Sequence, residues 1–221
     1  MKCMHEIEDG IEESKDGWKP AHSAHLVLWT IALAGLLCLV ILTDKQIYQW
    51  IRQIHTPWLS FVMNRIKPWG RLGIDGGIGL LLWGLGWILS RQNLKRAGVS
   101  VLLSILLVEA IIGIAKPAIG RIEQLGPQPG WSMSSSHSLN ERWGRFPSGD
   151  DGMAFATAGA LAIEFPVAAP FYYAVACLVG FERVYVGSHF ASDVFAAAWL
   201  GIIAARLVAD RRKKCKYKVD V

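Results

Sequence analysis

Six long apolar segments limit what this chain can fold into more than any other feature of its sequence. They lie at residues 25–43, 73–89, 97–115, 152–168, 170–186 and 190–209. Each approaches the length that an α-helix needs to cross the roughly 30 Å hydrocarbon core of a bilayer. The chain of 221 residues is also 52% hydrophobic and contains ten Trp, so it is more apolar than a typical soluble domain. We therefore predict an all-α, polytopic membrane protein built as a six-transmembrane-helix bundle.

Basic residues near the ends of the predicted spans indicate which side of the membrane each loop occupies. The C-terminal segment 210–221 is rich in Arg and Lys, and Arg91, Lys95 and Arg96 lie between the second and third spans. By the positive-inside rule both segments are cytoplasmic, and six crossings put the N-terminus on the same side. The loop 44–72 is also basic and would lie outside, which counts against this topology. We expect an integral protein of the plasma (inner) membrane with both termini in the cytoplasm.

Polar segments flank the apolar region and divide the chain into three parts. Residues 1–24 form a polar, acidic tail that lacks the basic start of a cleaved secretory signal. Residues 25–209 form the membrane domain, and residues 210–221 form a basic cytoplasmic tail. The net charge of +5 comes from residues at helix ends rather than from one soluble face, so no nucleic-acid partner is expected. The four Cys are scattered without metal-ligand spacing.

Three reactive side chains, Arg183, His189 and Asp193, lie around the junction of the fifth and sixth apolar segments. If the chain is helical from His189 onward, His189 and Asp193 lie four residues apart on one face, so the carboxylate can orient the imidazole. An imidazole held this way can attack phosphorus, and the Arg183 guanidinium suits phosphate oxygens. Taken alone, the cluster could be a polar helix end that satisfies its own hydrogen bonds.

A second segment with matching chemistry argues for a phosphate site. Pro147, Ser148 and Gly149 precede the fourth apolar segment, where Ser148 can cap the helix and Gly149 lets backbone N–H groups approach an anion. Lys116 ends the third segment, where a Lys that snorkels to the interface is the ordinary interpretation. Glu109, seven residues earlier, lies on nearly the same helical face. A carboxylate inside a span is often functional, but we favour a neutral, hydrogen-bonded and structural group.

The cluster around His189 resembles the third motif of the type-2 phosphatidic acid phosphatase superfamily, whose integral-membrane members are lipid phosphatases. That motif reads Ser-Arg, five residues, His, three residues, Asp. Arg183, His189 and Asp193 match it, and Glu182 stands where Ser is usual. The resemblance implies that His189 is the nucleophile of a phosphohistidine intermediate and that Asp193 orients it. Arg183 would bind the phosphoryl oxygens.

The family's second motif, Pro-Ser-Gly-His, is present except for its last residue. By the same resemblance, Ser148 and the Gly149 amide would donate hydrogen bonds to the phosphoryl oxygens. Asp150 stands in the position of the histidine that protonates the leaving alcohol in the family. We expect Asp150 to serve as the general acid. The alternatives are a leaving group that needs little protonation, such as the phosphate half of a diphosphate, or a weakened or lost activity.

The family's first motif, Lys, six residues, Arg-Pro, is broken in this chain. Lys116 matches the motif's Lys, which implies a phosphate-binding role. The arginine position holds Glu123, and Gln124 follows it instead of Pro. We expect Arg121, five residues after Lys116, to replace the missing arginine.

The resemblance implies hydrolysis of a lipid phosphate or lipid diphosphate at the outer membrane face, without a metal ion or any other cofactor. The expected partners are the lipid substrate and the bilayer, and the sequence indicates no oligomeric state. One alternative is a lipid-linked phosphotransferase, in which an acceptor alcohol replaces water. Another is a membrane protein that binds a lipid or an anion without catalysis.

Overall fold

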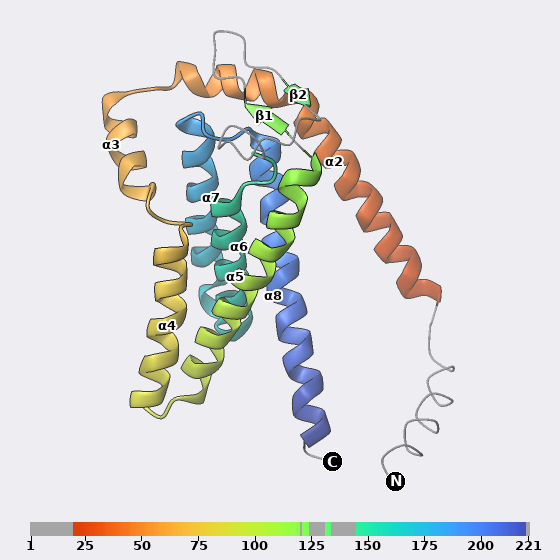
Figure 1. Ribbon diagram of the computed structural model, residues 1–221, viewed down its shortest axis with the longest axis vertical. Coiled ribbons are helices and arrows are strands. Elements are labelled where there is room, and N and C mark those ends of the chain that lie inside the picture. The colour runs from red at the N-terminus through yellow and green to blue at the C-terminus, as the bar shows by residue number, and fades with distance from the viewer. Residues whose placement is uncertain (1–19, 120, 124–130, 134–144, 220–221) are drawn as a thin grey trace. The chain divides into compact units, whose positions relative to one another are not determined.

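The computed structural model describes residues 20–119, 121–123, 131–133 and 145–219, whose regular secondary structure is helical apart from one short pair of strands (Figure 1). The seven α-helices of these residues are α2 (Pro20–Gln53), α3 (Pro57–Ile66), α4 (Leu72–Ile88), α5 (Gln92–Ile119), α6 (Gly149–Glu164), α7 (Ala169–Tyr185) and α8 (Ala191–Val219). A 3-10 turn, η2 (Pro166–Ala168), precedes α7. Strands β1 (Arg121–Glu123) and β2 (Trp131–Met133) pair antiparallel, with Arg121 opposite Met133.

The chain divides into two compact units, residues 1–39 and residues 40–221. The described part of the first unit is the beginning of α2, in which Leu28, Trp29 and Ile31 are exposed. Exposed large apolar side chains along one helix suit contact with lipid chains. All the contacts described below belong to residues 40–221.

Each of the six predicted apolar segments falls on a helix, and four of these helices are long and apolar enough to cross a membrane. These four spans are Leu28–Gln53, Gln92–Ile119, Pro166–Tyr185 and Ala191–Arg212. Helices α4 and α6 have 17 and 16 residues. At about 1.5 Å per residue they are shorter than the hydrocarbon core, so the six crossings stay a prediction.

Several helices differ from the prediction. Helix α2 continues to Gln53 and α8 to Val219, each ten residues beyond the predicted end of its span, and α5 extends past both of its predicted ends. Helix α3 lies inside the predicted loop 44–72, where Thr56 caps it by accepting a hydrogen bond from Leu59 N. Pro57 at the first helical position has the backbone angle that a helix start requires.

The core of the second unit forms where α5, α6 and α8 run side by side (Figure 1). Branched side chains of α5, including Val101 and Ile105, pack against small side chains of α6 and α8, such as Ala156 and Ala204. Helices α6 and α8 can come close because Gly201 has no β-carbon. A β-carbon at this position would lie only 2.5 Å from the Gly152 carbonyl oxygen. Small residues that allow such close contact are typical of helix packing in membranes.

Helices α6 and α8 run parallel, which separates two ends of the bundle. At one end, Ser148 N donates a hydrogen bond to Asp193 O over 3.3 Å. At the other end, Arg212 Nη1 lies 3.0 Å from Glu164 Oε1, and Arg212 also bonds to Ser100 Oγ. The Arg212 end leads into the basic C-terminal segment, so that segment begins at the end of α6 opposite Ser148.

Candidate active site

A tight turn between α7 and α8 holds His189 and is built around the carbonyl oxygen of Arg183. Ser188 N and His189 N donate to this oxygen over 3.0 and 3.2 Å. Gly187 has φ = 75°, a left-handed conformation that glycine adopts without strain. Helix α8 begins at Ala191, so His189 precedes the helix instead of lying in its first turn as the sequence suggested.

His189 and Asp193 are nevertheless brought together. His189 Nδ1 lies 3.4 Å from Asp193 Oδ2, and Asp193 is buried. The same Oδ2 accepts a 2.8 Å hydrogen bond from Phe190 N, which fixes the carboxylate at the start of α8. The His189 side chain is 14% exposed, so its ring lies at the edge of the protein where a ligand can reach it.

Arg183 is buried in the last turn of α7 and is held from several sides. Its Nη2 donates to Lys67 O over 2.8 Å and to Trp69 O over 3.4 Å. The same nitrogen lies 3.0 Å from Asp150 Oδ2, and Nε lies 3.3 Å from Glu182 Oε2. The guanidinium therefore links α7, the first turn of α6 and the connection between α3 and α4.

Buried carboxylates balance the positive charges of this region. Glu182, which the sequence singled out only as a departure from the family motif, is fully buried beside Arg183. Asp151 is also fully buried, and its carboxylate interacts electrostatically with His189 and Arg183. The charged groups of the site thus include Glu182 and Asp151 in addition to the residues that match the family motifs.

The N-terminus of α6 faces the same region. Ser148 caps the helix, and its Oγ accepts a hydrogen bond from Asp151 N over 3.5 Å. A β-carbon on Gly149 would lie 3.6 Å from Lys116 Nζ and 3.4 Å from Glu109 Oε1. The side chains of Lys116 and Glu109 therefore both lie next to the N-terminus of α6.

The structure brings together seven of the eight predicted site residues: Lys116, Ser148, Gly149, Asp150, Arg183, His189 and Asp193. Arg121 lies in β1, but its side chain falls outside the described part of the chain. Arg145, two residues before Pro147, donates from Nη1 to Ser188 O over 2.7 Å. It therefore braces the turn that carries His189.

A carboxylate that the sequence did not single out supports the start of α8. Asp44, in the second half of α2, accepts a 2.9 Å hydrogen bond from Ser192 N and another from Ser192 Oγ. Both side chains are buried. Asp44 thereby satisfies a free N–H group at the beginning of α8, beside the His189 and Asp193 pair.

We expect Asp44→Ala to lower the free energy of unfolding by about 2 kcal/mol, because it leaves two buried donors without this acceptor. Ser192→Ala removes one of the two bonds and should lower it by about 1 kcal/mol. Thermal unfolding of the detergent-solubilised protein measures the difference. A larger loss for Ser192→Ala than for Asp44→Ala would contradict this account of the contact.

Four of the described helices can span a membrane, and Lys, Arg, His and carboxylate side chains gather near the N-terminus of α6. These features define an α-helical integral membrane protein with a charged site. Within that class the family is clear. The chain belongs to the PAP2 superfamily, whose family model matches residues 97–216. This range begins in α5, ends in α8 and contains all eight predicted site residues, so it confirms the family resemblance found in the sequence motifs.

Two solved structures share this fold. The crystal structure of LpxE from Aquifex aeolicus has 24% sequence identity and a TM-score of 0.57, and the match covers 75% of this chain and 93% of that one. A transmembrane PAP2-type phosphatidylglycerolphosphate phosphatase from Bacillus subtilis has 24% identity and a TM-score of 0.63, with 86% and 96% covered. A search of curated protein sequences gave no match.

Proposed function

We propose that this protein hydrolyses a lipid phosphate or lipid diphosphate through a phosphohistidine intermediate. The observation that carries the proposal is the contact of His189 with Asp193, beside Arg183 and the N-terminus of α6, in a chain of the PAP2 superfamily. The lipid phosphatase among the similar structures supports a lipid substrate. The apolar helices support a substrate that stays in the bilayer.

In the proposed reaction the phosphoryl group binds between Arg183, Lys116 and the N-terminus of α6, where positive charge and free N–H groups favour an anion. Because Nδ1 of His189 faces the Asp193 carboxylate at 3.4 Å, Nε2 is the nitrogen left to attack phosphorus. A nitrogen–phosphorus bond forms, and the bond from phosphorus to the leaving oxygen breaks. Water then attacks the phosphohistidine, which releases inorganic phosphate and restores the imidazole.

Asp150 is the proposed donor of the proton that the leaving oxygen takes up. In the structure Asp150 Oδ2 lies 3.0 Å from Arg183 Nη2. A phosphate that binds Arg183 would take over this contact and leave the Asp150 carboxyl group beside the leaving oxygen.

Asp150→Asn separates this role from a purely structural one. We expect kcat to fall about 10²-fold on a lipid phosphomonoester, because its alkoxide leaving group requires a proton. The loss should be smaller on the diphosphate of the same lipid, whose leaving phosphate is already a weak base. Phosphate release from the two lipids is compared with that of Asp210→Asn, an exposed aspartate near the end of α8. Equal losses on both lipids would contradict the proton-donor role.

The activity itself is tested with purified wild-type protein in lipid vesicles that carry a panel of lipid phosphates and diphosphates, with EDTA present. We expect phosphate release from at least one lipid despite the chelator, because the proposed site uses protein side chains alone. A water-soluble phosphate ester serves as the comparison and should be a poorer substrate. A folded protein that releases phosphate from no lipid in the panel would overturn the proposal.

We further propose that the protein crosses the plasma membrane six times. Both termini then lie in the cytoplasm, and the site lies at the outer face. Supporting this topology, Arg212 and the basic segment lie at the opposite end of α6 from Ser148. The proposed parts are the polar tail 1–24, the membrane domain 25–209 and the basic tail 210–221.

A further inference from the structure

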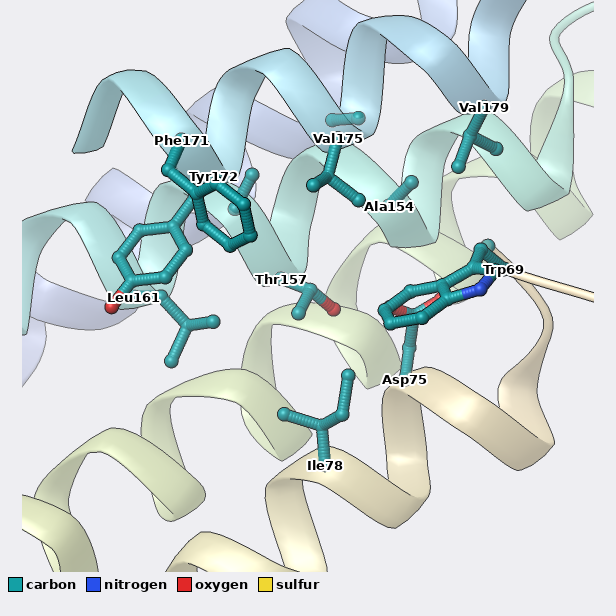
Figure 2. A pocket seen from close by; sticks show the side chains of 13 residues that line it. Trp69, Asp75, Ile78, Ala154, Thr157, Leu161, Phe171, Tyr172, Val175 and Val179 are labelled. Carbon is teal, nitrogen blue, oxygen red and sulfur yellow. The ribbon is translucent and has the colours of Figure 1, made fainter. Parts of the chain in front are cut away.

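A mostly apolar pocket of about 230 Å³ opens between α4, α6 and α7 (Figure 2). Its apolar lining includes Ile78, Leu161, Phe171, Val175 and Val179. The volume is below the roughly 300–1,000 Å³ of sites that enclose a whole drug-sized ligand. The pocket is therefore suited to one part of a larger molecule, and its lining is suited to a hydrocarbon chain.

Two buried polar side chains interrupt this apolar lining. Asp75 of α4 is 4% exposed and Thr157 of α6 is 5% exposed. Neither Asp75 Oδ2 nor Thr157 Oγ1 forms a hydrogen bond of good geometry within the described residues, although the two side chains lie close enough to interact with each other. Figure 2 shows both side chains at the pocket wall near the Trp69 indole. Unpaired polar groups in an apolar, buried setting are costly, and a carboxyl group at membrane depth frequently marks a ligand site.

The pocket adjoins the phosphate site through the connection between α3 and α4. Trp69 and Gly70 line the pocket, and Trp69 O accepts a hydrogen bond from Arg183 Nη2. A β-carbon on Gly70 would lie 2.7 Å from the carbonyl oxygen of Asp150. Thr157 follows Asp150 by seven residues, so it lies about 10 Å further along α6. A lipid whose phosphate binds Arg183 can thus direct a chain into the pocket and past Thr157.

From these observations, and on the basis of the proposed function, we propose that this pocket holds a hydrocarbon chain of the substrate and selects a chain with a hydrogen-bond donor near the head group. A hydroxyl group can donate to Asp75 and accept from Thr157, and an amide N–H can donate to Asp75. An unsubstituted chain offers neither group a partner and leaves Asp75 and Thr157 with only each other. Sites built around a substrate hydroxyl discriminate strongly against an analogue that lacks it.

The test compares three lipid phosphates with the same head group and chain length. The first has an unsubstituted chain, the second a hydroxyl near the head group, and the third an amide at the same place. We expect wild-type kcat/KM to be about 10- to 100-fold higher for at least one of the two donor-bearing lipids. In the double variant Asp75→Ala, Thr157→Val this ratio should fall to near one. Ile78→Ala, which changes the apolar wall alone, should alter all three values in proportion and keep the ratio.

A binding measurement separates a failure of this inference from a failure of the proposed function. Long-chain lipids without a phosphate, with and without the hydroxyl or amide, are added to the protein during thermal unfolding. The donor-bearing lipids should raise the unfolding temperature of the wild type more than the plain lipid does, and this difference should vanish in the double variant. Equal effects of all the lipids on the wild type, or equal kcat/KM values in a wild type that hydrolyses them, would overturn the inference.

Discussion

His189→Ala is expected to abolish phosphate release, with a fall in kcat of about 10³-fold or more, because the variant has no nucleophile to form the phosphoenzyme. The protein should remain folded, since the His189 side chain lies at the protein edge and the turn that carries it is held by backbone hydrogen bonds to Arg183 O. Brief incubation with a lipid labelled in its phosphate should give a labelled wild-type protein and an unlabelled variant. The label should be stable to base and labile to acid, as expected for a phosphorus–nitrogen bond.

The matched control is His55→Ala, which removes a histidine from the same unit. His55 Nε2 contacts Tyr185 O over 2.9 Å, and its ring stacks on the Tyr185 ring. This variant should keep kcat within a few-fold of the wild type. If His189→Ala keeps wild-type turnover while His55→Ala behaves as expected, His189 is not the nucleophile.

The six helices that carry the apolar segments could be predicted from the sequence because each is marked by its own composition. Lipid-facing and buried positions are both apolar, so each such helix appears in the sequence as one long, mostly apolar segment. Helix α3 gave no comparable signal, because its ten residues are mixed in polarity and fall within a loop between apolar runs. The β1 and β2 pair is equally short, with three residues in each strand.

The motif residues could be found because their spacing along the chain repeats a family pattern. The groups that hold them could not. Arg183 is anchored by the carbonyl oxygens of Lys67 and Trp69, and any residue type supplies a carbonyl oxygen. Asp44 meets Ser192 across 148 positions of sequence, a distance at which no periodicity or motif links two residues. The surroundings of the site therefore follow from the packing of helices, which the sequence does not display.

Arg183→Lys should lower kcat/KM about 10²- to 10³-fold, although the substitution preserves the charge. The Arg183 guanidinium contacts Lys67 O and Trp69 O while it faces Asp150, so its position is fixed before the substrate binds. A lysine ammonium is a point charge that cannot keep these contacts and also contact phosphate oxygens in a planar fork. Phosphate release over a range of lipid concentrations measures the loss.

Arg65→Lys is the matched control, because Arg65 is exposed on α3 and its guanidinium lies 5.1 Å from the centre of the Phe61 ring, outside the site. Its kcat/KM should stay within a few-fold of the wild type. If positive charge alone were sufficient, Arg183→Lys would match this control. The fixed geometry predicts the opposite, because a buried arginine with four partners on three segments contributes orientation as well as charge. An Arg183→Lys variant with wild-type kcat/KM would therefore contradict the assignment of Arg183 as the group that orients the phosphate.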